Sequence, residues 1–201
     1  MIPSTNGKGM LLLDMGANVD NRANHLYQFA MMADIYMEDI LGRKNPKVGL
    51  VNIGSEENKG SELTKETHKL LKESHLNFQG NFETRDILSG VVDVAVTDGF
   101  TGNIILKTIE GTAMSMMGEI KKSMTSSLKS KIGAVLVKSG LKNIKDLLDY
   151  RQYGGAPLLG LNGHVLKAHG SSDAVAIASA VRQAKRMANS DSIEKISNKV
   201  G

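Results

Sequence analysis

The chain has 201 residues, of which 41% are hydrophobic and 23% are charged, a composition typical of a globular α/β protein that buries a core. It contains no cysteine, which excludes disulfides, thiolate metal sites and a cysteine nucleophile. The formal charge is +4, and neither a secretion signal nor an apolar run of membrane-spanning length is present, so a cytoplasmic location is expected.

Short apolar runs bounded by Gly, Asn and Asp alternate with amphipathic segments in the first half of the chain. The runs are typical of strands buried on both faces and cover Met10–Leu13, Val48–Val51 and Val91–Val96. The segments between them predict helices at His25–Leu41 and Glu62–Ser74, and a short strand at Asn77–Gly80 is expected to join the same sheet. This alternation predicts an open, layered α/β fold with a mainly parallel sheet.

A long helical stretch follows Asp98 and runs to about Tyr150, with breaks expected near Gly133 and Ser139–Gly140. Apolar residues recur in it at spacings of three and four, which places them on one face: Met117, Ile120, Met124, Leu128 and Ile132. An open apolar face binds either another copy of the chain or a lipid interface. A buried dimer seam is the interpretation that the sequence favours slightly.

The same helical stretch is rich in lysine. Between Ile120 and Lys145 it carries seven lysines and no acidic residue, and the candidates for partner or membrane contact are Lys121, Lys122, Lys129, Lys131 and Lys138. Such a stretch suits an anionic partner, whether an acidic protein, a phospholipid surface or nucleic acid. The alternative is a solvated helix face that happens to be basic.

A glycine-rich segment at 153–163, a predicted strand at Val165–Lys167 and a helix from Ser172 to Met187 complete the chain. Polar residues gather directly after four predicted strands, at 14–18, 52–60, 97–103 and 168–172. Ligands in an open α/β sheet bind outside the carboxyl ends of the strands, so the four loops are expected to converge on one site.

Glycines in two of these loops favour an anion such as phosphate, because they let backbone amides approach it closely: Gly54, Gly60, Gly99 and Gly102. A helix that begins after Gly102 would aim its N-terminal amides at the same region. The alternative for each glycine is simple turn geometry. In the same way Asp14, Asp98 and Ser172 could serve only as helix caps.

Lys59, framed by Asn58 and Gly60, is the strongest single candidate for a phosphate or thioester contact. Asn18 and Asn103 could donate amide hydrogen bonds to a developing oxyanion. His169 could act as a donor or general acid, although a lone histidine is more often structural. Nucleotide-hydrolase, dehydrogenase and zinc motifs are missing from the sequence, so no metal or cofactor is expected.

Six segments stand out together, in chain order: Leu-Leu-Leu-Asp-Met-Gly-Ala-Asn-Val-Asp at 11–20, Asn-Ile-Gly-Ser-Glu-Glu-Asn-Lys-Gly at 52–60, Asn81, Thr-Asp-Gly-Phe-Thr-Gly-Asn at 97–103, Tyr-Gly-Gly-Ala at 153–156 and Lys-Ala-His-Gly-Ser-Ser at 167–172. In this order they resemble the phosphate acyltransferase family PlsX, from about Pro3 to the closing helix. The resemblance implies that inorganic phosphate attacks the thioester of acyl-acyl carrier protein, which gives acyl phosphate for phospholipid synthesis.

The resemblance also implies a three-layer α/β sandwich with a mainly parallel sheet, similar to phosphotransacetylase and isocitrate-dehydrogenase-like folds, plus a protruding long helical pair. The chain would be a single partial phosphate acyltransferase domain, 1–201, with a helical appendage for dimer or membrane contact at about 104–150. A homodimer associated peripherally with the membrane follows from the family, with acyl carrier protein and phosphate as partners, no cofactor and no nucleic acid.

By motif matching, the family's catalytic residues fall on Lys59, which would neutralise phosphate or the thioester oxygen, and Asn103, which would hold the carbonyl. The residues expected to bind substrate or phosphate are those of the surrounding loops: Asp14, Asn18, Gly54, Ser55, Glu56, Gly60, Asp98, Gly99, Thr101, Gly102, His169 and Ser171.

Family members also carry an upstream segment with an Asp-x-Met-Gly-Gly-Asp loop and an Ala-Gly-Asn-Thr-Gly-Ala loop, and this sequence begins after both. Half of the substrate crevice would be missing, so little or no transferase activity is expected from the chain alone. The alternatives are a coenzyme A-dependent phosphotransacetylase and a non-catalytic module that binds acidic partners or membranes.

Overall fold

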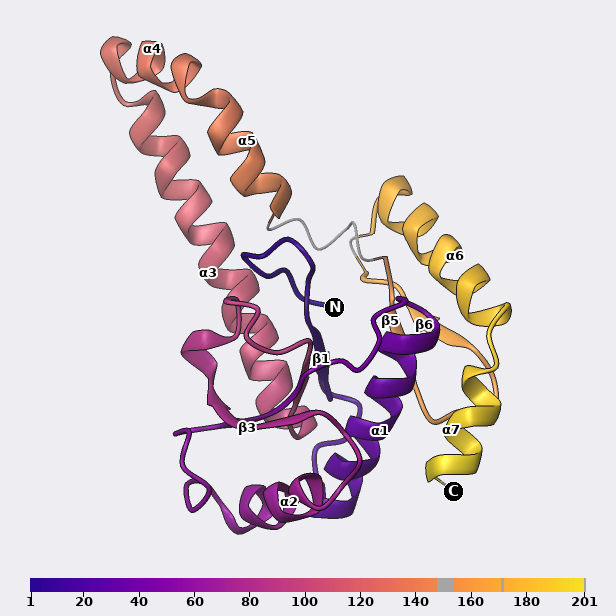
Figure 1. Ribbon diagram of the computed structural model, residues 1–201. Coiled ribbons are helices and arrows are strands. Elements are labelled where there is room, and N and C mark those ends of the chain that lie inside the picture. Colours follow the sequence, from indigo (N-terminus) through magenta and orange to yellow (C-terminus); the bar gives the residue numbers. More distant parts are fainter. Residues whose placement is uncertain (148–153, 171, 201) are drawn as a thin grey trace.

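A computed structural model of the protein describes residues 1–147, 154–170 and 172–200. Its main sheet has four parallel strands in the order β1 (Leu11–Leu13), β4 (Val94–Val96), β2 (Val48–Asn52) and β3 (Phe78–Glu83) (Figure 1). All four predicted strands of the first half are therefore confirmed. β4 is shorter than predicted, because Val91 is half exposed and Asp93 turns its carboxylate to the Lys47 backbone N–H.

Helices cover both faces of this sheet. On one face, α1 (Ala23–Asp39) and α2 (Glu62–Lys72) pack on side chains such as Leu50 and Val96. On the other face, Ile105 from the start of α3 (Gly99–Thr125) joins a second core with Leu12 and Ala95. Successive side chains of a strand point to opposite faces, so each strand serves both cores. These layers confirm the predicted α/β fold and are consistent with a three-layer sandwich.

The C-terminal part adds a separate pair of antiparallel strands, β5 (Ala156–Leu158) and β6 (Val165–Lys167). They lie beside α1 (Figure 1), where a Cβ on Gly160 would meet the Met32 sulfur at 3.1 Å. Met187 of α6 (Ala174–Ala188) and Ile196 of α7 (Ser192–Val200) join the α1 side of the core. A short 3-10 turn, η1 (Thr84–Asp86), follows β3.

The second half of α3 leaves the body of the protein and continues into α4 (Leu128–Leu136) and α5 (Lys138–Leu147) (Figure 1). We refer to residues 110–147 as the protrusion. Its breaks lie at Ser126–Ser127 and at Val137. The break predicted near Ser139–Gly140 is therefore confirmed to within two residues, whereas the one predicted near Gly133 is wrong. The Ser127 hydroxyl accepts a hydrogen bond from the Ser130 N–H at 3.1 Å and starts a new helix, whereas Gly133 lies inside α4.

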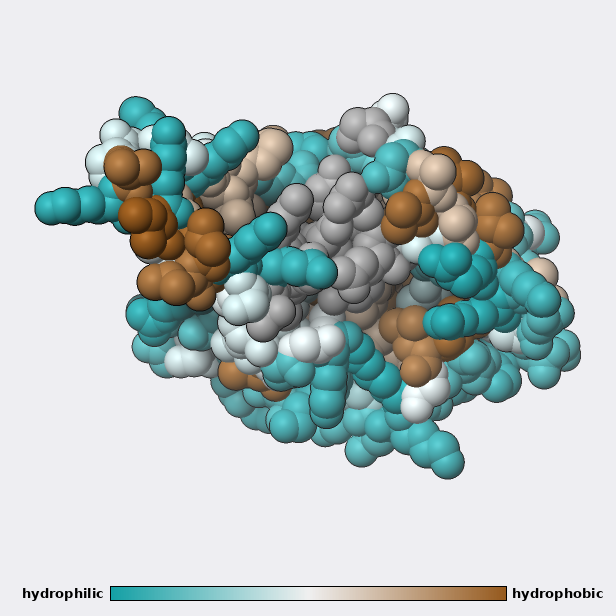
Figure 2. All heavy atoms as spheres, turned by 90° about the horizontal axis from the view of Figure 1, so that it is seen from above, coloured by the Kyte–Doolittle hydropathy of each residue, from teal (hydrophilic) through white to brown (hydrophobic). Residues whose placement is uncertain are grey.

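Apolar side chains are exposed on the protrusion, and Figure 2 shows them as brown spheres at one end of the molecule. The predicted apolar face is half-buried at its beginning, at Met117 and Met124, and exposed at its end, where 77% of Leu128 is accessible. The described helices include none that is both long enough and apolar enough to cross a membrane.

Candidate active site

The loop after β1 is organised by one buried carboxylate. Asp14 is 4% exposed, and its Oδ1 accepts hydrogen bonds from the N–H groups of Gly16 and Ala17, both at 3.0 Å. Its Oδ2 accepts from the N–H of Asn18 at 2.7 Å and from the Asn18 side chain at 3.3 Å. Four donors satisfy the carboxylate inside its own loop. Asp14 therefore shapes the loop, and the Asn18 amide is held against it.

The same loop is joined to the start of α3. The N–H of Gly99 donates to the Asn18 carbonyl at 3.1 Å, and a Cβ on Gly102 would overlap the carbonyl oxygen of Asp14. A Cβ on Gly16 would lie 3.4 Å from the Cβ of Asn103. Close packing thus explains Gly99 and Gly102 in the first turn of α3. This joint places Asn103, the predicted carbonyl-binding residue, beside the β1 loop.

α3 begins at Gly99 and not after Gly102, so its free amides differ from those expected. The Asp98 side chain caps the helix by accepting from the Thr101 N–H at 2.8 Å. The N–H of Gly102 donates to the Asp98 carbonyl at 2.9 Å, and that of Gly99 is already engaged. The N–H groups of Gly99, Thr101 and Gly102 therefore have partners within the protein, and the Asn103 side chain is exposed beside them.

The loop after β2 carries Lys59 and is closed by two buried amide side chains. Asn52 Nδ2 donates to the Lys59 carbonyl at 3.1 Å, and Asn81 Nδ2 donates to the Glu56 carbonyl at 2.8 Å. Gly60, with φ of +90°, occupies the left-handed region that a turn there requires. The Lys59 side chain is exposed, and within the described part of the chain its ammonium group makes no ion pair.

A histidine that was not predicted from the sequence, His68, holds Asn81 in position against this loop. Because Asn81 Nδ2 faces Glu56, its Oδ1 faces His68, and the buried His68 Nδ1 donates to it at 2.9 Å. His68 Nε2 lies 3.7 Å from the Glu57 carboxylate, which also binds Lys72 at 2.6 Å. The Lys72 hydrogen bond lowers the pKa of Glu57. His68 lies on the buried face of α2, three residues before Leu71, and this spacing was the available signal.

The remaining predicted residues are less closely connected. β6 pairs with β5 and is not part of the four-stranded sheet, so the argument that predicted four converging loops applies to three of them. The sheet-edge argument therefore does not apply to His169, whose role stays a prediction, and Ser171 lies outside the described residues. Ser55 and Glu56 are exposed in the Lys59 loop, and a Cβ on Gly54 would meet the Lys59 side chain.

The fold and these loops define an α/β protein of the open-sheet class, with its polar loops at the carboxyl ends of β1, β2 and β4. The chain belongs to the family described as fatty acid synthesis protein, whose family model matches residues 1–195.

Three of its curated relatives are named phosphate acyltransferase. The protein of Lysinibacillus sphaericus is 53% identical over 199 residues, covering 99% of this chain and 60% of the relative. The Bacillus pumilus protein is 55% identical over 94% of this chain and 57% of the relative. The Geobacillus thermodenitrificans protein is 52% identical over 97% and 60%. The chain therefore spans about 60% of the length of the curated relatives it matches.

Proposed function

We propose that the protein transfers a fatty acyl group from acyl carrier protein to inorganic phosphate, giving acyl phosphate for phospholipid synthesis. One observation carries the proposal. Lys59 and Asn103 follow the neighbouring strands β2 and β4 at the same sheet edge, and both side chains are exposed while hydrogen bonds and close packing fix the backbone around them. The names of the relatives, phosphate acyltransferase, support the same reaction.

The two residues have complementary roles in this reaction. A phosphate oxygen attacks the thioester carbonyl carbon, the new C–O bond forms, and the C–S bond breaks as the carrier thiolate leaves and takes a proton from water. The Lys59 ammonium offsets the phosphate charge during the approach. The Asn103 amide donates to the carbonyl oxygen as it becomes negative. The protein itself need not be acylated.

The loops around these residues complete the phosphate side of the crevice. Asp14 and Asp98 act by holding backbone, since their carboxylates are occupied by N–H donors. We assign the rest of the crevice to the portion of the relatives that this chain does not span. On this proposal the 201-residue chain alone has little transferase activity. A chimaera in which the N-terminal portion of the Lysinibacillus sphaericus relative precedes this chain restores it.

The test uses that chimaera and measures phosphate-dependent release of the free carrier thiol. Lys59→Ala and Asn103→Ala should each lower the rate by a factor on the order of a hundred, as for the loss of one oxyanion donor. Lys185→Ala, an exposed lysine of α6, is the matched control and should leave the rate unchanged. Normal turnover in both site variants would refute the assignment. Faster turnover with coenzyme A thioesters than with acyl carrier protein would make the enzyme a phosphotransacetylase.

We also propose that the protrusion mediates dimer formation and contact with the membrane. A second copy of the chain covers its apolar face, and the exposed lysines beside that face hold the dimer against anionic lipid at the cytoplasmic surface. Three apolar side chains of the protrusion are each more than 70% exposed in the single chain: Leu128, Val135 and Leu136. Their exposure supports a partner that covers this face. Of the five predicted contact lysines only Lys122 has an acidic partner in the described residues, Glu119 at 3.7 Å.

A further inference from the structure

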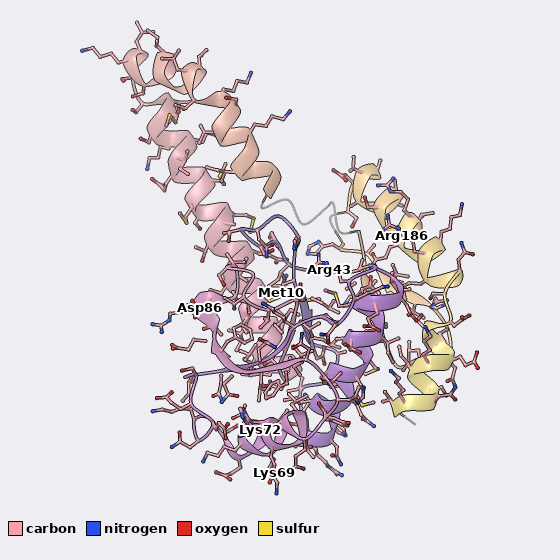
Figure 3. All side chains as sticks on the ribbon, viewed as in Figure 1. Met10, Arg43, Lys69, Lys72, Asp86 and Arg186 are labelled. Carbon is pink, nitrogen blue, oxygen red and sulfur yellow. The ribbon has the colours of Figure 1, made fainter. Side chains whose placement is uncertain are left out.

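A second cationic region lies at the opposite end of the sheet from Lys59. Lys8 precedes β1 and Arg43 follows α1, so both belong to the amino-terminal edge of the strands. Together with Arg182 and Arg186 of α6 they line a recess of about 210 Å³. None of these four residues was predicted from the sequence to have a functional role. Figure 3 shows Arg43 and Arg186 on either side of this region.

The recess has a marked excess of positive charge. Four of its lining residues are cationic and none is acidic. Arg43 is oriented by the Gly9 carbonyl at 2.8 Å and by Asp93, 3.4 Å away, and Arg182 donates to the Ser179 hydroxyl at 2.7 Å. Arg186 has no acidic partner within 4 Å among residues 1–147, 154–170 and 172–200.

This charge arrangement is unfavourable without a counter-ion. Arg182 and Arg186 are four residues apart on one helix face, where like charges repel. The apolar side chains of Met1, Ile40 and Leu41 also line the recess, and beside them Gln183 donates to the buried Tyr36 hydroxyl at 2.6 Å. Burial raises the pKa of the Tyr36 phenol, and the Gln183 hydrogen bond and the nearby Arg186 charge oppose that rise. A bound anion would relieve the repulsion and accept hydrogen bonds from the guanidinium groups.

We propose that this recess is a second anion site, which binds inorganic phosphate or the phosphate group of a small phosphomonoester. Guanidinium groups present paired N–H donors that match phosphate oxygens. Arg182 and Arg186 of α6 offer such donors to the recess, whereas Arg43 already donates to the Gly9 and Lys8 carbonyls and contributes its charge. The volume admits a phosphate group with a small substituent. The site is separate from the proposed transfer site, because it lies at the other edge of the sheet.

The experiment is calorimetric titration of the 201-residue chain with inorganic phosphate, ethyl phosphate and acetate at constant ionic strength. The test variant is Arg182→Gln with Arg186→Gln. Its control, Lys185→Gln with Lys199→Gln, removes the same two charges from exposed positions outside the recess. Lys59→Ala separates this site from the loop at the carboxyl edge. Circular dichroism of each variant checks that the fold is kept.

We expect at least tenfold weaker phosphate binding in the arginine variant, with the control and Lys59→Ala retaining the wild-type affinity. Tighter binding of ethyl phosphate than of inorganic phosphate would identify a phosphomonoester as the ligand, and the reverse would identify the free ion. Three results would overturn the proposal: no saturable binding to the wild type, equal affinity in the arginine variant and its control, or acetate binding as tightly as phosphate.

Discussion

α1 and α3 are both continuous helices, but they are held in place by different forces. α1 has 17 residues and ten of them are buried, whereas α3 has 27 residues and buries only Gly99, Gly102 and Ile105, all within its first seven positions. The position of α1 is therefore set by packing along its whole length. The position of α3 is set at one end, and the rest depends on helix propensity and on whatever covers it.

The largest difference in stability is expected between two methionine substitutions, one in each helix. Met37 of α1 is fully buried and Met114 of α3 is 72% exposed. Met37→Ala removes core packing and should lower the free energy of unfolding by roughly 2–5 kcal/mol. Met114→Ala should change it by less than about 0.5 kcal/mol. Urea denaturation of the two variants measures both values, and equal losses would mean that α3 is packed as tightly as α1.

A second contrast lies within α3 itself. Gly102→Ala places a methyl group on the Asp14 carbonyl and should cost roughly 1–3 kcal/mol, because the helix must move away from the β1 loop. Gly111→Ala meets nothing within 4 Å and should stabilise the protein by about 0.5–1 kcal/mol through helix propensity. Thermal unfolding gives the sign of each effect. A stabilising Gly102→Ala would contradict the joint.

The exposed part of α3 and its two following helices give a third contrast, this time in binding. The chimaera should float with anionic vesicles at low salt and not at high salt, and Lys131→Gln should weaken binding by about 1 kcal/mol. Lys44→Gln, an exposed lysine outside the protrusion, is the control. Equal flotation with anionic and neutral vesicles, or with neither, would rule out an electrostatic role for these lysines.

Sedimentation of the same chimaera without lipid tests the dimer. A dimer whose seam includes Leu128 should dissociate more readily after Leu128→Asp, since the substitution buries an unpaired charge. If the wild type sediments as a monomer at all concentrations, the second-copy proposal is wrong.

The sequence predicted the parts of the fold that depend on hydrophobic pattern. The buried strands were predicted because strands that are buried on both faces form continuous apolar runs in the sequence. α1 was predicted from its amphipathic pattern. The break at Ser126–Ser127 was not predicted, because a glycine such as Gly133 costs only about 1 kcal/mol in a helix, and a local serine cap at Ser127 decides the break instead. β5 was read only as part of a glycine-rich segment, since Pro157 and its short length give no strand pattern.

The candidate site was predicted as a set of loops but not as a set of contacts. Asp14 and Asp98 were placed correctly after their strands, yet only the structure separates a carboxylate that holds backbone N–H groups from one that meets a ligand. His68 was missed because its partner, Asn81, is 13 residues away on β3. The spacing to Leu71 indicates that His68 is buried, but no local spacing identifies a partner on a strand.

The smallest expected effect concerns charge on the well-packed helix. Burial and the neighbouring Glu38 raise the pKa of Asp34, so its ionised form is disfavoured in the folded state. Asp34→Asn should therefore stabilise the protein at pH 7, by about 0.2–0.5 kcal/mol, the size of a repulsive pair four residues apart. The gain should vanish as the pH falls below the carboxyl pKa, where Asp34 is protonated. Urea titrations at pH 7 and at acidic pH test this, and a pH-independent difference would point to another cause.

The single-ended attachment of α3 makes that helix a lever. A 27-residue α-helix is about 40 Å long, so a tilt of about 5° at the Gly99–Gly102 joint moves its far end by roughly 3.5 Å. The same tilt shifts Asn103 by only a small fraction of that distance, since Asn103 sits next to the pivot. A displacement of the tip, whether caused by a second copy or by a surface, therefore produces only a small displacement of Asn103, the side chain proposed to bind the carbonyl.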